Sequence, residues 1–371
     1  MTQQWGRPTQ LQRGQQPPPP KAQWGRPAQP GFGGFPRQGN PYASGPGTYS
    51  PVPSYGPGPG GQLGPGPAPR QRNPLRALLL AVLGVAVVAL AALVITGRFA
   101  EPSQVAYQND DYRVPPPDTN PPPIPVPQSE QEVVQWTEAN AIYAQIMPAP
   151  VRCSVQPIDV QNASEAVLQS HFDGLVECLV RAWQPPVTDA GFIIIRPTVT
   201  IYGESITTKC GDSGINAFWC AADQQIYYSS ELPSQLRGLR GKWAADVVMA
   251  HEYGHLIQGR TGLFAAEIIA SQSTGSEKEG LIFHRRLETQ ADCFSGTFIR
   301  SVSTSLNIQQ ADVEEILNSY AVVGDDAASG DPNVVGDHGL SRSRLYWGNV
   351  GLGTSEIGAC NTFVAADHLV R

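Results

Sequence analysis

The chain has 371 residues, 41% of them hydrophobic, and its 38 Gly and 35 Pro are unevenly distributed. Residues 1–74 contain 18 of the prolines and 15 of the glycines, a composition that cannot bury enough apolar surface to offset the entropy of ordering. Residues 77–371 carry 17 of the 25 basic residues and all 32 acidic ones, a net charge of −15. This charge argues against nucleic acid as a partner, because phosphate contacts need clustered Lys and Arg.

Residues 77–96 form an apolar stretch of twenty positions without a charged side chain. At 1.5 Å per residue, such a helix crosses the hydrocarbon core of a bilayer, so we predict one transmembrane helix. A cleaved signal peptide would begin near the N-terminus, whereas 76 residues precede this stretch. Arg70, Arg72 and Arg76 precede the span, so the positive-inside rule places residues 1–76, a disordered basic tail, in the cytoplasm. The rest of the chain is then extracytoplasmic, on a single-pass cell-membrane protein.

Nine prolines in residues 102–127 indicate a stiff, extended spacer. We therefore assign residues 97–128 to a Pro-rich linker and 129–371 to one folded domain. The spacing of apolar residues, the capping pattern at Ser129 and the β-branched runs predict the elements of this domain. These are helices over 129–147 and 162–183, strands over 192–195, 198–202 and 225–228, and helices over 242–260, 281–300 and 308–323. Helices at both ends with a few strands between them predict an α+β domain.

All six cysteines follow the apolar stretch, as expected of a domain that matures in an oxidising compartment. Six cysteines allow 15 pairings. We favour Cys210–Cys220, because the short segment between them contains Gly211 and Gly214 and forms a tight loop. For the other four we predict Cys153–Cys178 and Cys293–Cys360. A cysteine metal site is disfavoured because the chain has no Cys-x-x-Cys pattern.

The chemistry-bearing motif is His251-Glu252-Tyr253-Gly254-His255, within the predicted helix 242–260. Residues four apart lie on one helix face, so His251 and His255 can present two imidazole nitrogens to one metal ion. Zinc fits this donor set, since a catalytic zinc takes three protein ligands and one water. Glu252, displaced by about 100° around the helix, can accept a proton from that water. Gly254 costs about 1 kcal/mol relative to Ala, which suggests that another group approaches the helix backbone there.

Glu288 is the strongest candidate for the third zinc ligand. It lies on a predicted helix with Asp292 four residues later, on the same face. Asp292 can accept a hydrogen bond from the far ring nitrogen of a ligand His and so fix its tautomer. Three other acids, Glu267, Glu277 and Glu279, compete for the ligand role, but none is followed by Asp at this spacing.

With these motifs, the sequence resembles the neutral zinc metallopeptidases of bacterial membranes. The resemblance rests on the His251–His255 motif with Gln258, on 288–296, on His338-Gly339 with Ser341 and Arg344, and on the Cys210 and Cys360 regions. It covers about 210–363 and implies a zincin-like metallopeptidase domain, with Glu288 as third ligand and Glu252 as general base. Leu340 and Ser343 stand where the family commonly has Thr and Gln.

His338 is a candidate for stabilising the oxyanion formed when hydroxide attacks a peptide carbonyl. A role for His338 as an ordinary loop histidine is an equal alternative. For Arg344, a structural role is the alternative to a functional one. The strand 225–228 is a candidate for pairing with an extended substrate, against the alternative of a core strand.

These observations favour a membrane-anchored zinc endopeptidase that cuts protein or peptide substrates in the cell envelope. The alternative is a catalytically idle zincin-fold envelope protein that serves binding or scaffolding, although the full set of His251, Glu252, His255 and Glu288 speaks against it. A third hypothesis, hydrolysis of a cell-wall peptide crosslink, predicts the same residues. Neither oligomeric state nor cleavage specificity follows from the sequence.

Overall fold

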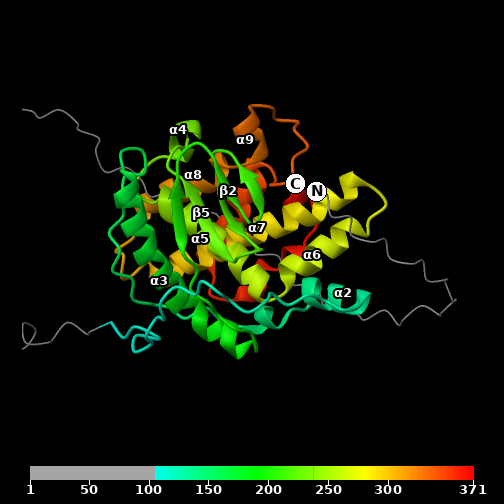
Figure 1. Cartoon of the computed structure of the whole chain (residues 1–371), viewed down its shortest axis with the longest axis horizontal. Helices are drawn as coiled ribbons and strands as arrows, with labels where there is room; N and C mark the ends of the chain where they lie inside the picture. The colour runs from blue at the N-terminus through cyan, green and yellow to red at the C-terminus, as the bar shows by residue number, and fades with distance from the viewer. Residues whose placement is uncertain (1–104, 237) are drawn as a thin grey trace, which may run out of the picture. The chain divides into compact units, whose positions relative to one another are not determined.

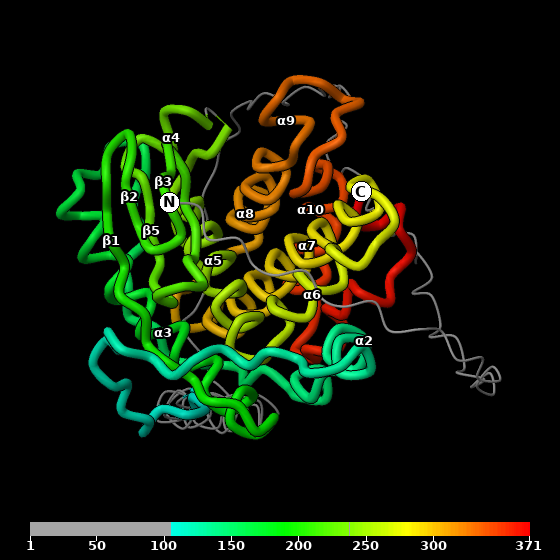
Figure 2. The backbone as a smooth tube through the Cα atoms, turned by 45° about the vertical axis from the view of Figure 1, so that its right-hand side comes forward, coloured from blue at the N-terminus to red at the C-terminus, as the bar shows by residue number. Residues whose placement is uncertain are grey.

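Helices make up most of the regular structure, and small sheets lie at one side of them (Figures 1 and 2). The computed structural model describes residues 105–236 and 238–371. The α-helices in this range are α2 (Glu130–Glu138), α3 (Glu165–Asp189), α4 (Leu232–Gln235), α5 (Ala244–Arg260), α6 (Leu263–Gln272), α7 (Glu277–Val302), α8 (Gln310–Val322), α9 (Asp325–Ser329) and α10 (Ser341–Gly353). The strands are β1 (Val199–Tyr202), β2 (Ile206–Thr208), β3 (Gly211–Ser213), β4 (Ala217–Cys220) and β5 (Gln225–Ser229), and the 3-10 helices are η1 (Ala141–Ala144), η2 (Ile357–Cys360), η3 (Thr362–Val364) and η4 (Asp367–Leu369). The predicted α+β class is confirmed.

The predicted membrane anchor falls outside this range. Both the tail 1–76 and the span 77–96 belong to residues that the structure does not describe. Across residues 105–236 and 238–371, no helix has the length and hydrophobicity needed to cross a membrane.

Residues 105–128 lie against the folded domain, contrary to the prediction of a spacer (Figure 2). Tyr112 and Ile124 pack against the hydrophobic core. The Asp118 amide donates to the Arg196 carbonyl at 2.8 Å, and the Arg260 guanidinium donates to the Pro122 carbonyl at 2.7 Å. Prolines lack an N–H but keep their carbonyls, so side-chain donors of the domain can fix an extended Pro-rich segment without a sheet ladder. The boundary at Ser129 therefore does not separate spacer from domain.

Most predicted helices are present, with shifted ends. The structure has α3, α5, α7 and α8 where helices were predicted, and Ser129 caps α2 by accepting from the Glu132 amide at 3.2 Å. The first helix ends at Glu138 instead of Met147, because Asn140 caps the separate 3-10 helix η1 by accepting from the Ile142 amide at 3.1 Å. The prediction contained neither α6 nor α10.

The larger sheet has the strand order β1-β5-β4. Strand β5 pairs in parallel with β1 and antiparallel with β4, while β2 and β3 form a separate antiparallel pair. Strands were correctly predicted at β1 and β5, but residues 192–195 are not a strand. Because β5 has a partner on each side, it cannot pair with a substrate, and the edge strands of this sheet are β1 and β4.

Helix α5 lies at the centre of the domain, with every one of its 17 residues buried. A helix covered on all sides needs no polar face, which explains its apolar sequence before the motif. Helix α7 packs against α5, α6 and α10. The contact with α5 is close at Gly254, where a Cβ would lie 3.1 Å from the backbone of Ala291. This approach accounts for a glycine inside the motif helix.

Three disulfides join the predicted cysteine pairs, Cys153–Cys178, Cys210–Cys220 and Cys293–Cys360. The Cys210–Cys220 bond ties β4 to the β2–β3 hairpin, and Cys293–Cys360 ties α7 to η2. Such bonds are typical of domains that mature outside the reducing cytoplasm.

An ion pair between α6 and α7 predicts a pH-dependent stability. His284 Nδ1 lies 2.9 Å from Oε1 of the buried Glu267. The contact with Glu267 raises the pKa of His284 against an opposing effect of burial. Protonated His284 therefore stabilises the fold fully below its unfolded pKa of about 6.5, and this contribution is lost as pH rises through the higher folded pKa. We expect His284→Gln to lower the melting temperature by about 3 °C or less at pH 5.5, and by a smaller amount at pH 9.

Thermal unfolding at both pH values measures the difference. His368→Gln is the matched control, since His368 is exposed. An equal loss of stability at both pH values would contradict the role of the His284–Glu267 pair.

Candidate metal centre

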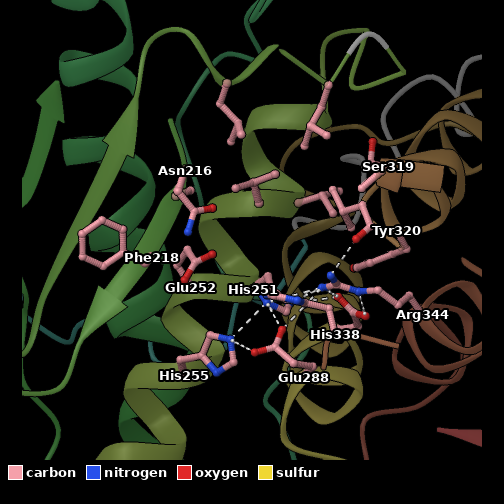
Figure 3. A pocket seen from close by; sticks show the side chains of 18 of the residues that line it. Asn216, Phe218, His251, Glu252, His255, Glu288, Ser319, Tyr320, His338 and Arg344 are labelled. Carbon is pink, nitrogen blue, oxygen red and sulfur yellow. Dashed lines mark hydrogen bonds and ion pairs between the residues drawn. The ribbon is translucent and has the colours of Figure 1, made fainter. Parts of the chain in front are cut away.

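Helix α5 presents both histidines of the motif on one face (Figure 3). The Nε2 atoms of His251 and His255 lie 3.1 Å apart, and both side chains are buried. Residues four apart on a helix lie one above the other, which explains how the short motif brings the two rings together.

Helix α7 brings Glu288 to the same point. Its carboxylate oxygens lie 3.3 Å from the Nε2 atoms of His251 and His255. One ligand atom from each of the three residues lies within 4.8 Å of the others. Burial opposes the charge on Glu288, but His255 and His338 outweigh it and hold the pKa of Glu288 well below its usual range. The cluster therefore contains a carboxylate anion facing two imidazoles.

The Nδ1 atoms of His251 and His255 both make hydrogen bonds. His251 Nδ1 donates to Asp292 Oδ1 at 2.9 Å, and His255 Nδ1 donates to Gln258 Oε1 at 2.8 Å. When the rings are neutral, as metal ligation requires, these bonds place the proton of each ring on Nδ1, and both Nε2 atoms then carry lone pairs. Glu288 Oε2 is also buried and makes no hydrogen bond within the described part of the chain. Two imidazole nitrogens and one carboxylate thus converge on one point, with Arg344 Nη2 at 3.4 Å from His251 Nε2 as the nearby donor. This arrangement fits a bound cation, and the His-His-Glu set fits zinc.

Asp292 is held in turn by Arg344 from α10. The Arg344 Nε donates to Asp292 Oδ2 at 2.8 Å and its Nη2 to Oδ1 at 2.9 Å, while Nη1 donates to the Val323 carbonyl at 3.1 Å. Burial opposes ionisation of Asp292, but Arg344 and then His251 outweigh it and lower its pKa. This fork fixes the carboxylate that orients His251. The sequence alone is compatible with a structural role and with a functional role for Arg344.

Glu252 lies beside the three candidate ligands and is held by strand β4. Its Oε2 accepts a hydrogen bond from the Trp219 amide at 3.0 Å, and the side chain is buried. Burial raises the pKa of Glu252, against the opposing effect of His251 and His255. A carboxylate with a raised pKa is a stronger proton acceptor than an exposed one.

The Trp219 ring lies against α5 at Gly259, where a Cβ would come within 2.2 Å of Cη2. This close approach positions β4, and with it the Trp219 amide, over α5. Neither the β4 contact nor the hydrogen bond from His255 to Gln258 was part of the sequence prediction. Gln258 follows His255 by three residues on the same helix, and this spacing is the signal that could have found it.

His338 lines the same cavity but lies outside the three-residue cluster (Figure 3). Its Nδ1 lies 2.7 Å from Asp337 Oδ1 and 3.6 Å from Asp325 Oδ1, and 52% of its side chain is exposed. The charge of Glu288, followed by Asp325 and Asp337, raises the pKa of His338 to about 11. The ring is therefore cationic at neutral pH. Since both carboxylates contact Nδ1, Nε2 lies on the opposite side of the ring.

The competing acids take other places. Glu267 pairs with His284, and Glu279 accepts from the Gly275 amide at 3.2 Å near the start of α7. Glu277 is exposed in the first turn of that helix. None of these three acids belongs to the metal cluster.

Comparison with known proteins finds a zinc peptidase family and several uncharacterised relatives. A family profile described as "Putative neutral zinc metallopeptidase" matches residues 141–363. The protein called "Uncharacterized protein YpfJ" of Escherichia coli (strain K12) is 29% identical over 224 residues, which are 56% of this chain and 78% of that protein. "Uncharacterized protein Rv2575" of Mycobacterium tuberculosis (strain ATCC 25618 / H37Rv) is 30% identical over 193 residues, 46% of this chain and 64% of that protein. No solved structure matches the chain.

Proposed function

This chain belongs to the putative neutral zinc metallopeptidase family, and from that premise we propose that it is a zinc-dependent endopeptidase with a zincin-like domain. The proposal gives His251, His255 and Glu288 the role of zinc ligands. The observation that carries it is the convergence of two Nε2 atoms and one carboxylate on one point, beside the buried Glu252.

Each chain group has a distinct task in peptide hydrolysis. Zinc bound at this site would lower the pKa of a water molecule and polarise the peptide carbonyl. Glu252 accepts the proton of the attacking water and passes it to the leaving nitrogen. Cationic His338 donates from Nε2 to the carbonyl oxygen as negative charge develops there. Asp292 and Gln258 keep both ligand rings in the required tautomer.

Strand β4 is the surface that we propose for the substrate backbone. It is an edge strand, and the Trp219 amide points away from β5 toward Glu252. An extended peptide that adds to this edge would pass directly beside the general base. Edge pairing is predicted at 225–228, but β5 is the central strand; of the two edge strands, β4 is the one whose amide contacts Glu252.

We propose that the domain acts outside the cytoplasm, held at the cell membrane by the predicted helix 77–96. Three disulfides support an oxidising location. The substrate class is a protein or peptide of the cell envelope, and a cell-wall peptide crosslink would be attacked by the same groups.

Metal removal tests the proposed activity. We expect the full chain, loaded with zinc, to cut members of an unbiased peptide library, with new termini identified by mass spectrometry. A chelator should reduce the rate by about 100-fold or more, since metal polarisation contributes several kcal/mol to the barrier, and added zinc should restore it. A chain that retains zinc and cuts no peptide would support the binding or scaffolding alternative instead.

A further inference from the structure

A buried hydrogen-bond network connects the His255 ring on α5 to two other elements, α7 and η1. His255 Nδ1 donates to Gln258 Oε1 at 2.8 Å, and Gln258 Nε2 donates to Gln290 Oε1 on α7 at 3.1 Å. Gln290 Nε2 donates in turn to the Tyr143 hydroxyl of η1 at 2.8 Å. We call the residues Gln258, Gln290 and Tyr143 the His255 network.

Backbone carbonyls fix the direction in which each side-chain amide points. The Leu287 carbonyl accepts from Gln258 Nε2 at 2.8 Å, and the Cys360 carbonyl accepts from Gln290 Nε2 at 3.1 Å. A carbonyl can only accept, so rotating either amide by half a turn would place two oxygens against each other. The Gln258 oxygen therefore faces the His255 ring. His255 Nδ1 then has to carry a proton, and Nε2 of the neutral ring keeps the lone pair that a metal ion needs.

The far end of the network is also fixed by the fold. The Tyr143 hydroxyl donates at 3.1 Å to the Thr137 carbonyl in α2, and Thr137 lies in the last turn, where carbonyls lack partners within the helix. Gly358 of η2 lies against the Tyr143 backbone, where a Cβ would come within 2.5 Å of the carbonyl oxygen. Because the Cys293–Cys360 disulfide ties η2 to α7, this contact holds η1 beside α7.

Burial makes each glutamine depend on the next member of the network. Both Gln258 and Gln290 are fully buried, so water cannot replace a lost partner. Without the Gln290 amide, one N–H of Gln258 would have no acceptor, and the preference of Gln258 for its present orientation would weaken. The effect would reach His255 through the one hydrogen bond that holds its ring.

We propose that Gln290 and Tyr143 are positioning residues for zinc binding, which act on the ligand His255 through Gln258. This inference rests on the proposed zinc peptidase function. Neither Gln290 nor Tyr143 lines the cavity of the metal centre, so their contribution would pass through the network and not through the substrate.

A double-mutant cycle on zinc affinity tests this role. Methionine has nearly the size of glutamine and makes no strong hydrogen bond. We expect Gln258→Met to weaken zinc binding by the full chain by about 10- to 100-fold, Gln290→Met by about tenfold, and Tyr143→Phe by less. In the double variant Gln258→Met/Gln290→Met, the second change should cause no further loss, because its route to His255 has been removed.

Gln224→Met is the matched control for removing a buried glutamine. Gln224 Nε2 donates to the Pro122 carbonyl at 2.8 Å, and its Oε1 accepts from Arg260 at 3.0 Å, so its bonds hold the Pro-rich segment. We expect this variant to unfold at a lower temperature and to keep the zinc affinity of the wild type. A general loss of stability is thereby separated from a loss at the metal site.

The ring proton of His255 gives a second readout that needs no metal. In the metal-free full chain labelled with ¹⁵N-histidine, the Nδ1 proton, assigned by its loss in His255→Gln, should exchange slowly with solvent. Its exchange should be faster in Gln290→Met and unchanged in Gln224→Met. Tyr143→Phe, which loses only a hydroxyl, serves as the test variant if Gln290→Met does not fold.

Wild-type zinc affinity in Gln290→Met, or additive losses in the double variant, would overturn the inference. If the wild-type chain binds no zinc, the proposed function fails, and the ring proton still decides the network. Fast exchange of that proton in the wild type, or equally slow exchange in Gln290→Met, would then overturn the role of the network. Slow exchange that Gln290→Met accelerates would support it.

Discussion

Replacing Glu252 by glutamine is expected to reduce peptide turnover by about 100- to 10,000-fold while zinc stays bound. The amide cannot accept the proton of an attacking water, so the general-base contribution disappears. The fold and the metal ligands should be unaffected, because glutamine has nearly the same shape. Its amide oxygen can still accept the hydrogen bond that the Trp219 amide donates to Glu252 at 3.0 Å. The measurement is kcat on a cleaved library peptide, together with zinc per chain.

A matched control removes one carboxylate elsewhere. Glu314 is exposed on α8, and Glu314→Gln should keep both the activity and the zinc content of the wild type. Loss of zinc in Glu252→Gln would mean that Glu252 supports metal binding, and full turnover would exclude it as the base. Either result would require another proton acceptor in the cavity.

The members of the candidate metal cluster, His251, His255 and Glu288, could be selected from the sequence because their spacing is local. His251 and His255 share one helix, as do Glu288 and Asp292, and four-residue spacing fixes each pair on one face whatever the rest of the chain does. The sequence could not supply the crossing of α5 and α7 that brings the pairs together. Gly254 was an indirect signal of that crossing, and Ala291 is the residue that approaches it.

Hydrogen-bond partners of the site that come from distant segments could not be predicted, for a related reason. Arg344 reaches Asp292 from a helix that the sequence pattern did not reveal, and α10 shows no strong apolar periodicity because glycines supply its contacts. A Cβ at Gly351 would lie 2.0 Å from the Cys293 carbonyl, so α10 packs on α7 backbone against backbone. Periodicity of apolar side chains does not report such packing.

The two misjudged segments have physical causes as well. Strand β4 is four residues long and lies within the segment 210–220 that the sequence predicts as a disulfide loop, although its pairing with β5 makes it one edge of the sheet. Composition predicts a spacer for the Pro-rich residues before Ser129, because it indicates an extended backbone and carries no information on what that backbone contacts. The buried guanidinium of Arg260, which binds the Pro122 carbonyl, makes that contact part of the fold.

Removing the Glu288 carboxylate should have the largest effect on the metal. We expect Glu288→Ala to weaken zinc binding by at least about 100-fold, because loss of a residue that only orients a ligand already costs about 10- to 100-fold. The substitution also removes the anion that lies 3.3 Å from the Nε2 atoms of His251 and His255, so zinc would keep two neutral ligands and no carboxylate ligand from the chain. Zinc per chain after dialysis, and competition with a chromogenic chelator, measure the loss.

Glu277→Ala is the control for position on the same helix. Glu277 is an exposed acid in the first turn of α7, and it competed with Glu288 as third ligand on sequence grounds. Its removal should leave zinc affinity unchanged. If Glu288→Ala binds zinc as tightly as the wild type, the three-residue site is wrong, since the two histidines alone would then have to account for the affinity. If both variants lose zinc equally, the effect comes from the stability of α7, and comparison of their unfolding temperatures without metal identifies that case.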